Sequence, residues 1–348
     1  MTIRLVPPRR RVALLLPGQG SQHPGMGLEL YGYDGVFTET MDEMFELLGP
    51  VDGASLRADW LAGDALAPEL LNDASRAQPL LFAVEYALGR SLLSQGVDVD
   101  VLLGHSVGEL SAAALAGVVD LPGAARVMAA RTAALAALPP GGMLAVAATA
   151  EELAPFVAAE HVEIGVVVGA LNAPRQTVLA GPEPRLTEVE GELRAAGVMF
   201  RRVPARQPFH SPASAPAAEV VEKVLSGVTL REPTIPIMST HSGAYVTREQ
   251  ALDPAFWAWH FVRVVLFWPA LDALLSEADH ALVELGPGQE LTVLARRHKA
   301  VRSGASTVRA VLPRGARGTR EAWDDALAEL AEYTGPAGGV PLACAAER

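Results

Sequence analysis

A serine lies between two glycines in the sequence Gly104-His105-Ser106-Val107-Gly108, which follows an apolar run and precedes a helix-forming stretch. This arrangement is the G-x-S-x-G nucleophile elbow in its strand–turn–helix context. The sharp turn crowds the backbone around the serine, so the positions two residues before and after it have no room for a Cβ atom. A helix that begins directly behind the serine also points free N–H groups at the reacting centre. The segment predicts a serine nucleophile, with a structural glycine-rich turn as the alternative.

A serine nucleophile needs a general base, and the chain has eight histidines. His210, in the sequence QPFHSP, follows the last strand predicted for a small inserted unit, where the chain returns to a larger domain. We therefore predict that His210 is the base, with His23 near the first glycine loop as the alternative. His105 is next to the serine, but neighbouring side chains on an elbow diverge, so it is predicted to pack beside the site. The other histidines are predicted at surface or ordinary polar positions.

A second glycine loop, PGQGSQ at residues 17–22, comes directly after the first apolar run. It does not match a phosphate-binding loop, because the chain has no G-x-x-x-x-G-K-[ST] motif and His23 interrupts the G-x-G-x-x-G spacing. In hydrolase-like folds, a loop beside the elbow supplies one N–H of an oxyanion hole and the residue after the nucleophile supplies the other. The sequence therefore predicts that the N–H groups of Gln19 and Val107 form this hole.

Short apolar runs alternate with Ala-, Leu- and Glu-rich stretches along the chain, which predicts an α/β fold. The runs predicted as buried strands are Val12–Leu16, Val99–Leu103, Gly165–Val168 and Ala281–Leu285. The stretches predicted as helices are Gln78–Leu93, Glu109–Leu115, Gly123–Leu138 and Arg185–Ala196.

A segment in the middle of the chain has a different order of elements, βαββαβ, which is the ferredoxin-like pattern. Its predicted elements are strand Met143–Ala148, helix Glu151–Glu160, strands Ile164–Leu171 and Thr177–Gly181, helix Pro184–Ala196 and strand Met199–Pro204. We therefore predict a hydrolase-like large subdomain with a parallel sheet, formed by residues 1–140 and 207–333, and a ferredoxin-like small subdomain inserted at 141–206. The active site is expected in the cleft between them, and residues 334–348 are predicted to be a disordered tail.

The composition excludes several classes of protein. Hydrophobic residues make up 50% and charged residues 20% of the 348 residues, as in an ordinary globular chain. The formal charge is 28 − 40 = −12, which opposes binding to nucleic acid. The single cysteine, Cys344, excludes an intrachain disulfide and a cysteine-rich zinc site, so the cytoplasm is the expected compartment. No uncharged apolar run reaches 18 residues, so no membrane span is predicted.

Taken together, the motifs resemble those of the malonyl-CoA:acyl-carrier-protein transacylases and of the acyltransferase domains of polyketide synthases. The resemblance covers about Val12 to Leu330. It rests on PGQGSQ with GMG at 25–27, Gln78-Pro79 at the start of a helix, GHSVGE at 104–109, Arg131, GGM at 141–143, Asn172 before a strand, PFHS at 208–211 and ELGPG at 284–288.

The resemblance implies a two-step transfer. Ser106 would attack the thioester of an acyl-CoA with His210 as base, and the phosphopantetheine thiol of an acyl carrier protein would then take the acyl group from the serine. The base would be oriented by a main-chain carbonyl, which the alignment of FWAWHFVRVVLFW places at His260, where the family commonly has Asn. No metal or redox cofactor is implied.

The resemblance also assigns the substrate-binding residues. Arg131, 25 residues after the serine, would hold the free carboxylate of a malonyl-type group in a bidentate pair, the alternative being a solvated helix arginine. Gln78, Asn172 and Phe209 are further candidates for substrate binding. Phe209 before the histidine resembles the malonyl-selective pattern, because methylmalonyl-selective relatives usually have Ser there.

Two features depart from the family pattern or extend it. Pro208 replaces a usually small residue, and Trp259 and Trp268 join Trp257 in one segment, which predicts either core packing or a pocket or carrier surface for an unusual acyl group. We also define a basic cluster as the proposed docking surface for the carrier protein or for CoA phosphates, with a solvated face as the alternative. It comprises Arg296, Arg297, Lys299 and Arg302, and the same basic stretch continues downstream with Arg309, Arg314 and Arg317. The second choice is Arg201 with Arg202.

The sequence therefore predicts a discrete, monomeric, cytoplasmic acyltransferase of polyketide or fatty acid biosynthesis. It would transfer a malonyl-type group from CoA to a separate carrier protein. Two alternatives within catalysis are a carrier-to-carrier transferase of an unusual acyl group and an editing hydrolase of acyl carrier proteins that uses the same Ser106 and His210. A noncatalytic scaffold is the alternative from outside catalysis.

Overall fold

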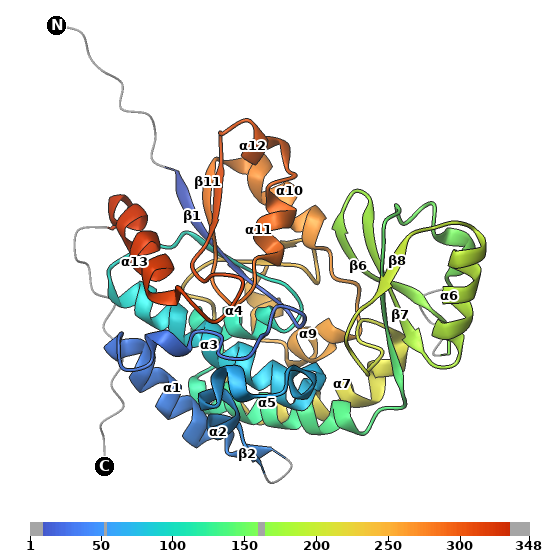
Figure 1. Ribbon diagram of the computed structural model, residues 1–348, viewed down its shortest axis with the longest axis horizontal. Coiled ribbons are helices and arrows are strands. Elements are labelled where there is room, and N and C mark those ends of the chain that lie inside the picture. The colour runs from blue at the N-terminus through green and yellow to red at the C-terminus, as the bar shows by residue number, and fades with distance from the viewer. Residues whose placement is uncertain (1–9, 52–53, 159–163, 335–348) are drawn as a thin grey trace, which may run out of the picture.

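The computed structural model describes residues 10–51, 54–158 and 164–334. It has a large lobe and a small lobe, each built around its own β-sheet (Figure 1). The chain enters the small lobe after a long helix of the large lobe and returns to the large lobe at the segment that contains His210. This arrangement confirms the predicted α/β class.

The sheet of the large lobe has six strands in the order β10-β9-β4-β1-β11-β12. Five neighbouring strands are parallel, and only β10 at the edge is antiparallel. The side chains of β1 and β4 are almost all buried, as expected for central parallel strands covered on both faces. The strands are β1 (Arg11–Leu16), β4 (Val101–Gly104), β9 (Ile237–Ser239), β10 (Ala244–Tyr245), β11 (His280–Glu284) and β12 (Thr307–Ala310).

Helices cover this sheet: in the view of Figure 1, α1, α3 and α5 lie below β1 and β11, and α10, α11 and α12 lie to the right of β11. The helices of the large lobe are α1 (Gly35–Leu48), α2 (Leu56–Leu61), α3 (Ala74–Ser94), α4 (Gly108–Leu115), α5 (Leu121–Ala136), α7 (Ala215–Leu225), α8 (Arg248–Ala251), α9 (Pro254–Ala258), α10 (Phe267–Glu277), α11 (Glu290–Ala295), α12 (Lys299–Arg302) and α13 (Thr319–Leu330). Short 3₁₀ turns are η1 (Leu28–Leu30), η2 (Gly63–Ala65), η3 (Pro68–Asn72), η5 (Pro212–Ser214), η6 (Trp259–Phe261) and η7 (Ala331–Tyr333), and a hairpin joins β2 (Pro50–Val51) and β3 (Ala54–Ser55).

The small lobe has a four-stranded antiparallel sheet in the order β6-β7-β5-β8. In chain order this is strand 2, 3, 1 and 4 of the lobe, which is the strand order of a ferredoxin-like sheet. Helix α6 packs on it through Leu186, Val189 and Leu193, which form a separate small core with residues of the sheet. The elements are β5 (Gly141–Val146), β6 (Val167–Ala173), β7 (Gln176–Pro182), α6 (Arg185–Ala195) and β8 (Phe200–Arg202).

One element predicted for the small lobe is wrong. The helix expected at Glu151–Glu160 is replaced by turns and the 3₁₀ helix η4 (Ala154–Phe156) as far as the structure describes it, and Glu160 lies outside the described residues. Pro155 explains the difference, because it lacks the N–H that an α-helix needs in its interior and its ring collides with the preceding turn.

Thr334, predicted as the first residue of the disordered tail, is the last residue that the structure describes. Thr334 forms an isolated antiparallel bridge with Val97 at the edge of the large lobe, so the tail does not begin there. Residues 335–348, including Cys344, lie outside the described residues. No helix in the described ranges has the length and apolar character needed to cross a membrane.

Candidate active site

The elbow that carries Ser106 has the strained geometry that its glycines permit. Ser106 has a φ of 54°, in the left-handed region that residues other than glycine rarely adopt. A Cβ atom at Gly104 would lie 2.4 Å from the backbone N of Glu109, and one at Gly108 would lie 2.2 Å from the carbonyl oxygen of Leu16. Both glycines are therefore required by close packing of the turn against its own helix and against the end of β1.

Glu109, the next residue after the elbow, anchors the turn from inside the protein. Its buried carboxylate accepts hydrogen bonds from Thr240 N (2.6 Å), Thr240 Oγ1 (2.7 Å) and His241 N (3.0 Å). Burial raises the pKa of Glu109, while these donors oppose that shift. The contact ties the start of α4 to the end of β9, and sequence reasoning missed it although Glu109 is part of the GHSVGE motif.

Ser106 and His210 form a hydrogen-bonded pair. The distance from Ser106 Oγ to His210 Nε2 is 2.7 Å, and His210 Nδ1 lies 2.9 Å from the carbonyl oxygen of Arg263. A carbonyl can only accept, so Nδ1 carries the proton and Nε2 is free to accept the proton of the serine hydroxyl. The two residues are 104 positions apart in the chain, and His210 also has a positive φ, 58°. The arrangement is that of a nucleophile and its general base.

The carbonyl that accepts from His210 Nδ1 belongs to Arg263 and not, as expected from the sequence, to His260. His210 Nδ1 donates to the carbonyl of Arg263, three residues after His260. The carbonyl of His260 raises the pKa of His210 less than the carbonyl of Arg263 does. The turn η6 ends at Phe261, whose carbonyl accepts from the backbone N–H of His210 at 2.7 Å, and this pairing brings the carbonyl of Arg263, two residues further on, to the imidazole. The imidazole of His260 instead contacts Arg131.

Burial lowers the pKa of His210 to about 3, and the hydrogen bond to the Arg263 carbonyl only partly opposes this shift. A group with a depressed pKa stays deprotonated down to that lower value, so His210 remains a neutral base throughout the physiological range. His105 and Arg131 are near enough to lower the pKa further.

We therefore expect acylation to be insensitive to mild acid. An exposed histidine with a pKa of about 6.5 would be only about one-tenth neutral at about pH 5.5, and its rate would fall about ten-fold. In this enzyme kcat/KM for acylation should change less than about two-fold between about pH 7.5 and 5.5. Single-turnover formation of the acyl-enzyme measures this, with circular dichroism at each pH to show that the fold persists. A ten-fold fall with a midpoint near pH 6.5 would contradict it.

The PGQGSQ loop lies against the elbow. A Cβ atom at Gly18 would lie 2.7 Å from the carbonyl oxygen of His105, so only glycine lets the two turns approach this closely. Neither the N–H of Gln19 nor that of Val107 donates a hydrogen bond to another described residue. Both groups are therefore unoccupied donors next to Ser106, which is the arrangement an oxyanion hole requires.

Arg131 is a buried cation with no acidic partner among the described residues. It is 1% exposed, and its Nε donates to Gln78 Oε1 (2.7 Å) while Nη1 donates to His260 Nε2 (2.9 Å). Its guanidinium carbon lies 4.3 Å from the centre of the Phe261 ring. Nη2 is buried without a hydrogen-bond partner. Burial lowers the pKa of Arg131 to about 9, so it is still charged at neutral pH.

A cavity of about 10 Å³ lies beside this arginine and has room for about one water molecule. Its other walls, apart from His260, are the apolar side chains of Leu110, Val127, Val221, Leu225 and Trp257. No carboxylate therefore approaches the guanidinium from this side. The alternative of a solvated helix arginine does not agree with the structure.

Gln78 connects Arg131 with the predicted oxyanion loop. Its Oε1 accepts from Arg131, and its Nε2 donates to Gln19 Oε1 at 2.9 Å. Gln78 is 2% exposed, and the Nε2 of Gln19 is buried with no partner in the described part of the chain. Gln78 thus supports the residues around the site through hydrogen bonds.

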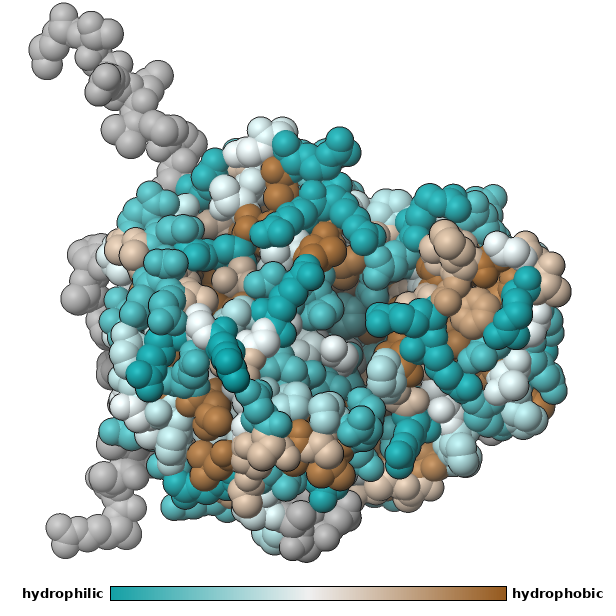
Figure 2. Space-filling view, viewed as in Figure 1, coloured by the Kyte–Doolittle hydropathy of each residue, from teal (hydrophilic) through white to brown (hydrophobic). Residues whose placement is uncertain are grey.

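Asn172 reaches the site from the small lobe. Its Oδ1 lies 2.9 Å from His105 Nε2, and this contact places β6 beside the elbow. The same strand passes His210 closely, since a Cβ at Gly169 would lie 3.4 Å from His210 Cβ. Figure 2 shows the surface hollowed between the two lobes, with hydrophilic side chains around the hollow. The pair of Ser106 and His210 therefore lies where the two lobes meet.

The aromatic residues near the site belong mainly to the core. Phe209 and Trp257 are 3% and 4% exposed and are part of the large hydrophobic core. Trp259 donates to Glu222 Oε2 at 2.7 Å, and Trp268 packs on the ring of His298. These contacts agree with core packing as the role of the tryptophans.

The basic cluster defined above is exposed at the ends of α11 and α12. None of its four residues forms an ion pair with another described residue, whereas Arg309 and Arg317 downstream pair with Glu329 and Asp64. Arg297 Nη1 donates to Gln176 Oε1 at 2.7 Å, which links α11 to the start of β7 and places the cluster beside the boundary of the lobes. The second choice is weaker because Arg202 pairs with Glu183 and Glu190.

The other histidines do not compete for the role of base. Among the described residues, the ring of His23 has one hydrogen-bond contact, to the carbonyl of the adjacent Pro24 at 3.0 Å. The sequence predicts His280 and His298 at surface or ordinary polar positions; both are buried, at 1% exposure each, so the surface alternative is wrong for them. His298 is held by Asp272 at 2.9 Å, and His161 lies outside the described residues.

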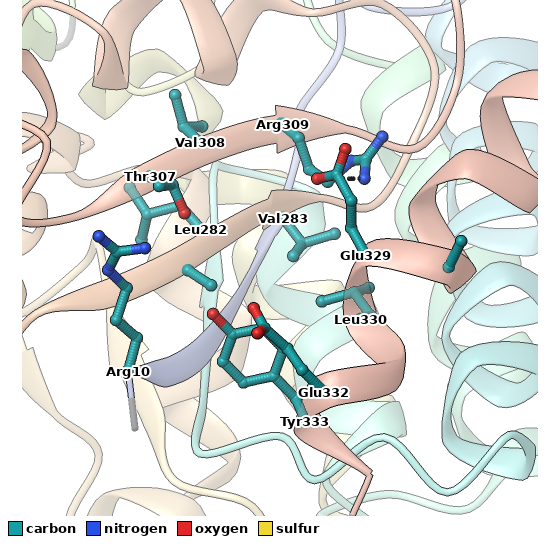
Figure 3. A pocket seen from close by; sticks show the side chains of 12 residues that line it. Arg10, Leu282, Val283, Thr307, Val308, Arg309, Glu329, Leu330, Glu332 and Tyr333 are labelled. Atoms are coloured by element: carbon teal, nitrogen blue, oxygen red, sulfur yellow. Dashed lines mark ion pairs between the residues drawn. The ribbon is translucent and has the colours of Figure 1, made fainter. Parts of the chain in front are cut away.

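A cavity of about 460 Å³ opens elsewhere, between β11, β12 and α13. Figure 3 shows the ion pair of Arg309 with Glu329 on one side of it and Arg10, Glu332 and Tyr333 around the other. Its described lining residues include no serine, cysteine or histidine. Within the described residues no group of three or more His, Cys, Asp or Glu side chains could hold a metal ion.

The fold and the paired serine and histidine define an enzyme of the acyl-transfer class. The chain belongs to the acyl transferase domain family, whose model matches residues 14–335. This confirms the resemblance and the acyltransferase class inferred from the motifs.

Three comparisons place the chain within this family. The polyketide synthase GfsA of Streptomyces halstedii is 36% identical over 327 residues, which is 92% of this chain and 4% of GfsA. The acyl transferase domain of SpnD, solved in complex with 2-(pent-4-yn-1-yl)malonyl, is 33% identical with a TM-score of 0.84 and covers 94% of this chain and 78% of that one. The malonyl CoA-acyl carrier protein transacylase of Coxiella burnetii, at 22% identity, shares the fold with a TM-score of 0.79 over 94% of this chain and 98% of its own.

The curated relatives are much longer proteins. This chain spans 4% of GfsA and only 5% of a second polyketide synthase of Streptomyces halstedii, GfsB. Their whole activities therefore involve regions that have no counterpart in this sequence.

Proposed function

We propose that this acyltransferase transfers a malonyl-type group from CoA to the phosphopantetheine thiol of an acyl carrier protein, in polyketide or fatty acid biosynthesis. The observation that carries the proposal is Arg131, a buried guanidinium with an unoccupied N–H and no acidic partner among the described residues. A charge in that state is a binding site for an anion. A carboxylate on the acyl group satisfies it in bidentate geometry.

The proposed first step forms the acyl-enzyme. Ser106 Oγ attacks the thioester carbonyl while its proton passes to Nε2 of His210, 2.7 Å away. The N–H groups of Gln19 and Val107 bind the oxyanion of the tetrahedral intermediate. When that intermediate collapses, the C–S bond breaks, and the imidazolium of His210 returns its proton to the departing CoA thiolate.

The second step reverses this sequence with a different thiol. Nε2 of His210 takes the proton of the phosphopantetheine thiol, the sulfur attacks the acyl-serine, and the C–Oγ bond breaks with return of the proton to Ser106. Burial of His210 keeps its imidazole neutral and therefore ready to accept a proton at the start of each step. Phe209, buried beside His210, is proposed to favour a malonyl group without an α-substituent.

The experiment that tests the proposal follows the mass of the intact protein after brief mixing with malonyl-, methylmalonyl- or acetyl-CoA. We expect malonyl-CoA to give the fastest and most complete adduct. Addition of a phosphopantetheinylated carrier protein should then move the malonyl group onto the carrier. No adduct from any of the three esters would overturn the proposal. An adduct that decays equally fast with and without the carrier would identify a hydrolase instead.

We also propose the basic cluster as the surface that docks the acidic carrier. Reversing charge with Arg297→Glu and Lys299→Glu should raise KM for the carrier about ten-fold and leave acylation by malonyl-CoA within about two-fold. The difference in KM for the carrier between wild type and the charge-reversed protein should shrink at high salt, because screening weakens the attraction between the basic cluster and the acidic carrier. A pair of exposed arginines outside the cluster, Arg231→Glu with Arg248→Glu, is the matched control. Unchanged kinetics with the carrier would refute this docking surface, and equal losses in both steps would assign it to CoA.

The remaining parts of the proposal concern the setting of the enzyme. The single cysteine favours a reducing compartment, and we propose that the enzyme works in the cytoplasm as a monomer. Light scattering of the purified chain tests the monomer, and a molar mass of twice the chain would contradict it.

A further inference from the structure

One short segment supports both halves of the proposed chemistry. We call it the 257–263 turn, with the sequence WAWHFVR. It contributes the carbonyl of Arg263 to His210 Nδ1 and the carbonyl of Phe261 to the backbone N–H of His210, at 2.9 and 2.7 Å. From the same turn the imidazole of His260 and the ring of Phe261 contact Arg131.

The tautomer of His260 follows from its two contacts. Its Nδ1 lies 2.5 Å from the carbonyl oxygen of Trp257, which can only accept, so Nδ1 carries a proton. Its Nε2 lies 2.9 Å from Nη1 of Arg131, which can only donate, so Nε2 is the acceptor. His260 is therefore neutral. Burial, followed by the charge of Arg131, lowers its pKa well below the usual range and keeps it neutral at every working pH.

Neutral acceptors have a specific effect on a buried arginine. An aspartate or glutamate at either position would hold Arg131 equally well but would cancel its charge, and the attraction for a substrate carboxylate would be lost. Gln78 Oε1 and His260 Nε2 orient the guanidinium from two sides without adding negative charge. The Phe261 ring, with its centre 4.3 Å from the guanidinium carbon, covers one face of the cation and adds no negative charge.

We propose that His260 is a positioning residue that makes this site selective for acyl groups with a free carboxylate, because it holds the Arg131 guanidinium in place with a neutral acceptor. This inference rests on the proposed function. It adds that selectivity requires the side chain of His260, at a position where the sequence predicts a role for the backbone alone. His260 does not touch the reacting atoms, so its effect should be confined to substrates that use Arg131.

The test compares three reactions of Ser106 in wild type, His260→Ala and His260→Asn. The reactions are acylation by malonyl-CoA, acylation by acetyl-CoA and sulfonylation by phenylmethanesulfonyl fluoride, the last two lacking a carboxylate. In His260→Ala, kcat/KM for malonyl-CoA should fall about ten-fold or more, since a hydrogen bond to a charged group is lost. The two carboxylate-free reactions should stay within about two-fold. In His260→Asn the amide oxygen can accept from Arg131, so the malonyl rate should recover most of the loss.

A merely structural role gives a different pattern. If His260 only packs the 257–263 turn, the carbonyls that hold His210 shift and all three reactions slow in the same proportion, which would overturn the inference. The matched control is His298→Ala, which removes another buried histidine outside the site and should leave the ratio of malonyl to acetyl rates unchanged. Absence of a malonyl adduct in the wild type would overturn the proposed function and this inference together. A normal wild-type adduct with no selective loss in His260→Ala would overturn the inference alone.

Discussion

Replacement of Ser106 by alanine is expected to abolish the acyl-enzyme, with a loss of roughly 10³-fold or more in the rate of transfer. The reason is geometric, because Ser106 is the hydroxyl held 2.7 Å from Nε2 of His210. Without that oxygen no covalent intermediate can form, and the carrier thiol would have to attack the CoA thioester directly. Intact-protein mass spectrometry after mixing with malonyl-CoA measures the adduct, and transfer to the carrier is followed in parallel.

The control must separate loss of the nucleophile from loss of the fold. Ser226→Ala removes an exposed serine at the end of α7 and should react like the wild type. Ser106→Gly removes the same hydroxyl and also relieves the positive φ of 54°, so it should be inactive yet at least as stable to heat as the wild type. Retained transfer in a folded Ser106→Ala protein would refute the assignment of the nucleophile.

Replacement of Arg131 by methionine is expected to lower kcat/KM for malonyl-CoA about 10²- to 10³-fold and to leave acetyl-CoA largely unaffected. In the proposed binding mode the substitution removes two charge-assisted hydrogen bonds to the malonyl carboxylate, each among the stronger interactions in proteins. Acetyl-CoA has no carboxylate and gains nothing from the guanidinium. The ratio of the two rates, measured by single-turnover mass spectrometry, should therefore collapse toward one.

Two further measurements make this result specific. Arg131→Lys keeps a charge but not the planar fork, and we expect it to recover only part of the malonyl rate. The thermal midpoint of Arg131→Met checks the fold, because the substitution removes a buried charge without an acidic partner and also leaves Gln78 Oε1 and His260 Nε2 without their donor. Equal losses for malonyl- and acetyl-CoA, or no loss for either, would contradict carboxylate binding by Arg131.

The nucleophile and its base can be predicted because their signals are local. The glycines around Ser106 report a turn that cannot hold a Cβ, and the structure shows the contacts of 2.4 and 2.2 Å that forbid one. His210 is distinguished by its place after the inserted lobe, where the chain returns to the large sheet. The hydrophobic runs likewise locate β1, β4 and β11 correctly, because buried parallel strands are continuous apolar segments.

The rest of the site depends on contacts between distant parts of the chain, which no local pattern encodes. His210 Nδ1 donates to the carbonyl of Arg263, which follows the 3₁₀ turn η6, and not to that of His260. A loose sequence alignment cannot distinguish two carbonyls that are three residues apart. The hydrogen bond from Thr240 N to the Glu109 carboxylate joins residues that are 131 positions apart in the chain. In the small lobe, Pro155 outweighs a helical composition over Glu151–Glu160. Strands β9 and β12 escape prediction because neither is a continuous apolar run: β9 has only three residues and ends in Ser239, and β12 alternates apolar residues with Thr307 and Arg309.

The 257–263 turn has a consequence for recombination between related domains. It supports Arg131 from one side and His210 from the other within seven consecutive residues, so neither support can be inherited without the other. A crossover between the helix that carries Arg131 and the 257–263 turn takes the two from different parents. The arginine of one parent then contacts the turn of the other parent. Under the roles proposed for Arg131 and His260, a hybrid enzyme should keep both substrate choice and reactivity only when Arg131, His210 and the 257–263 turn come from the same parent.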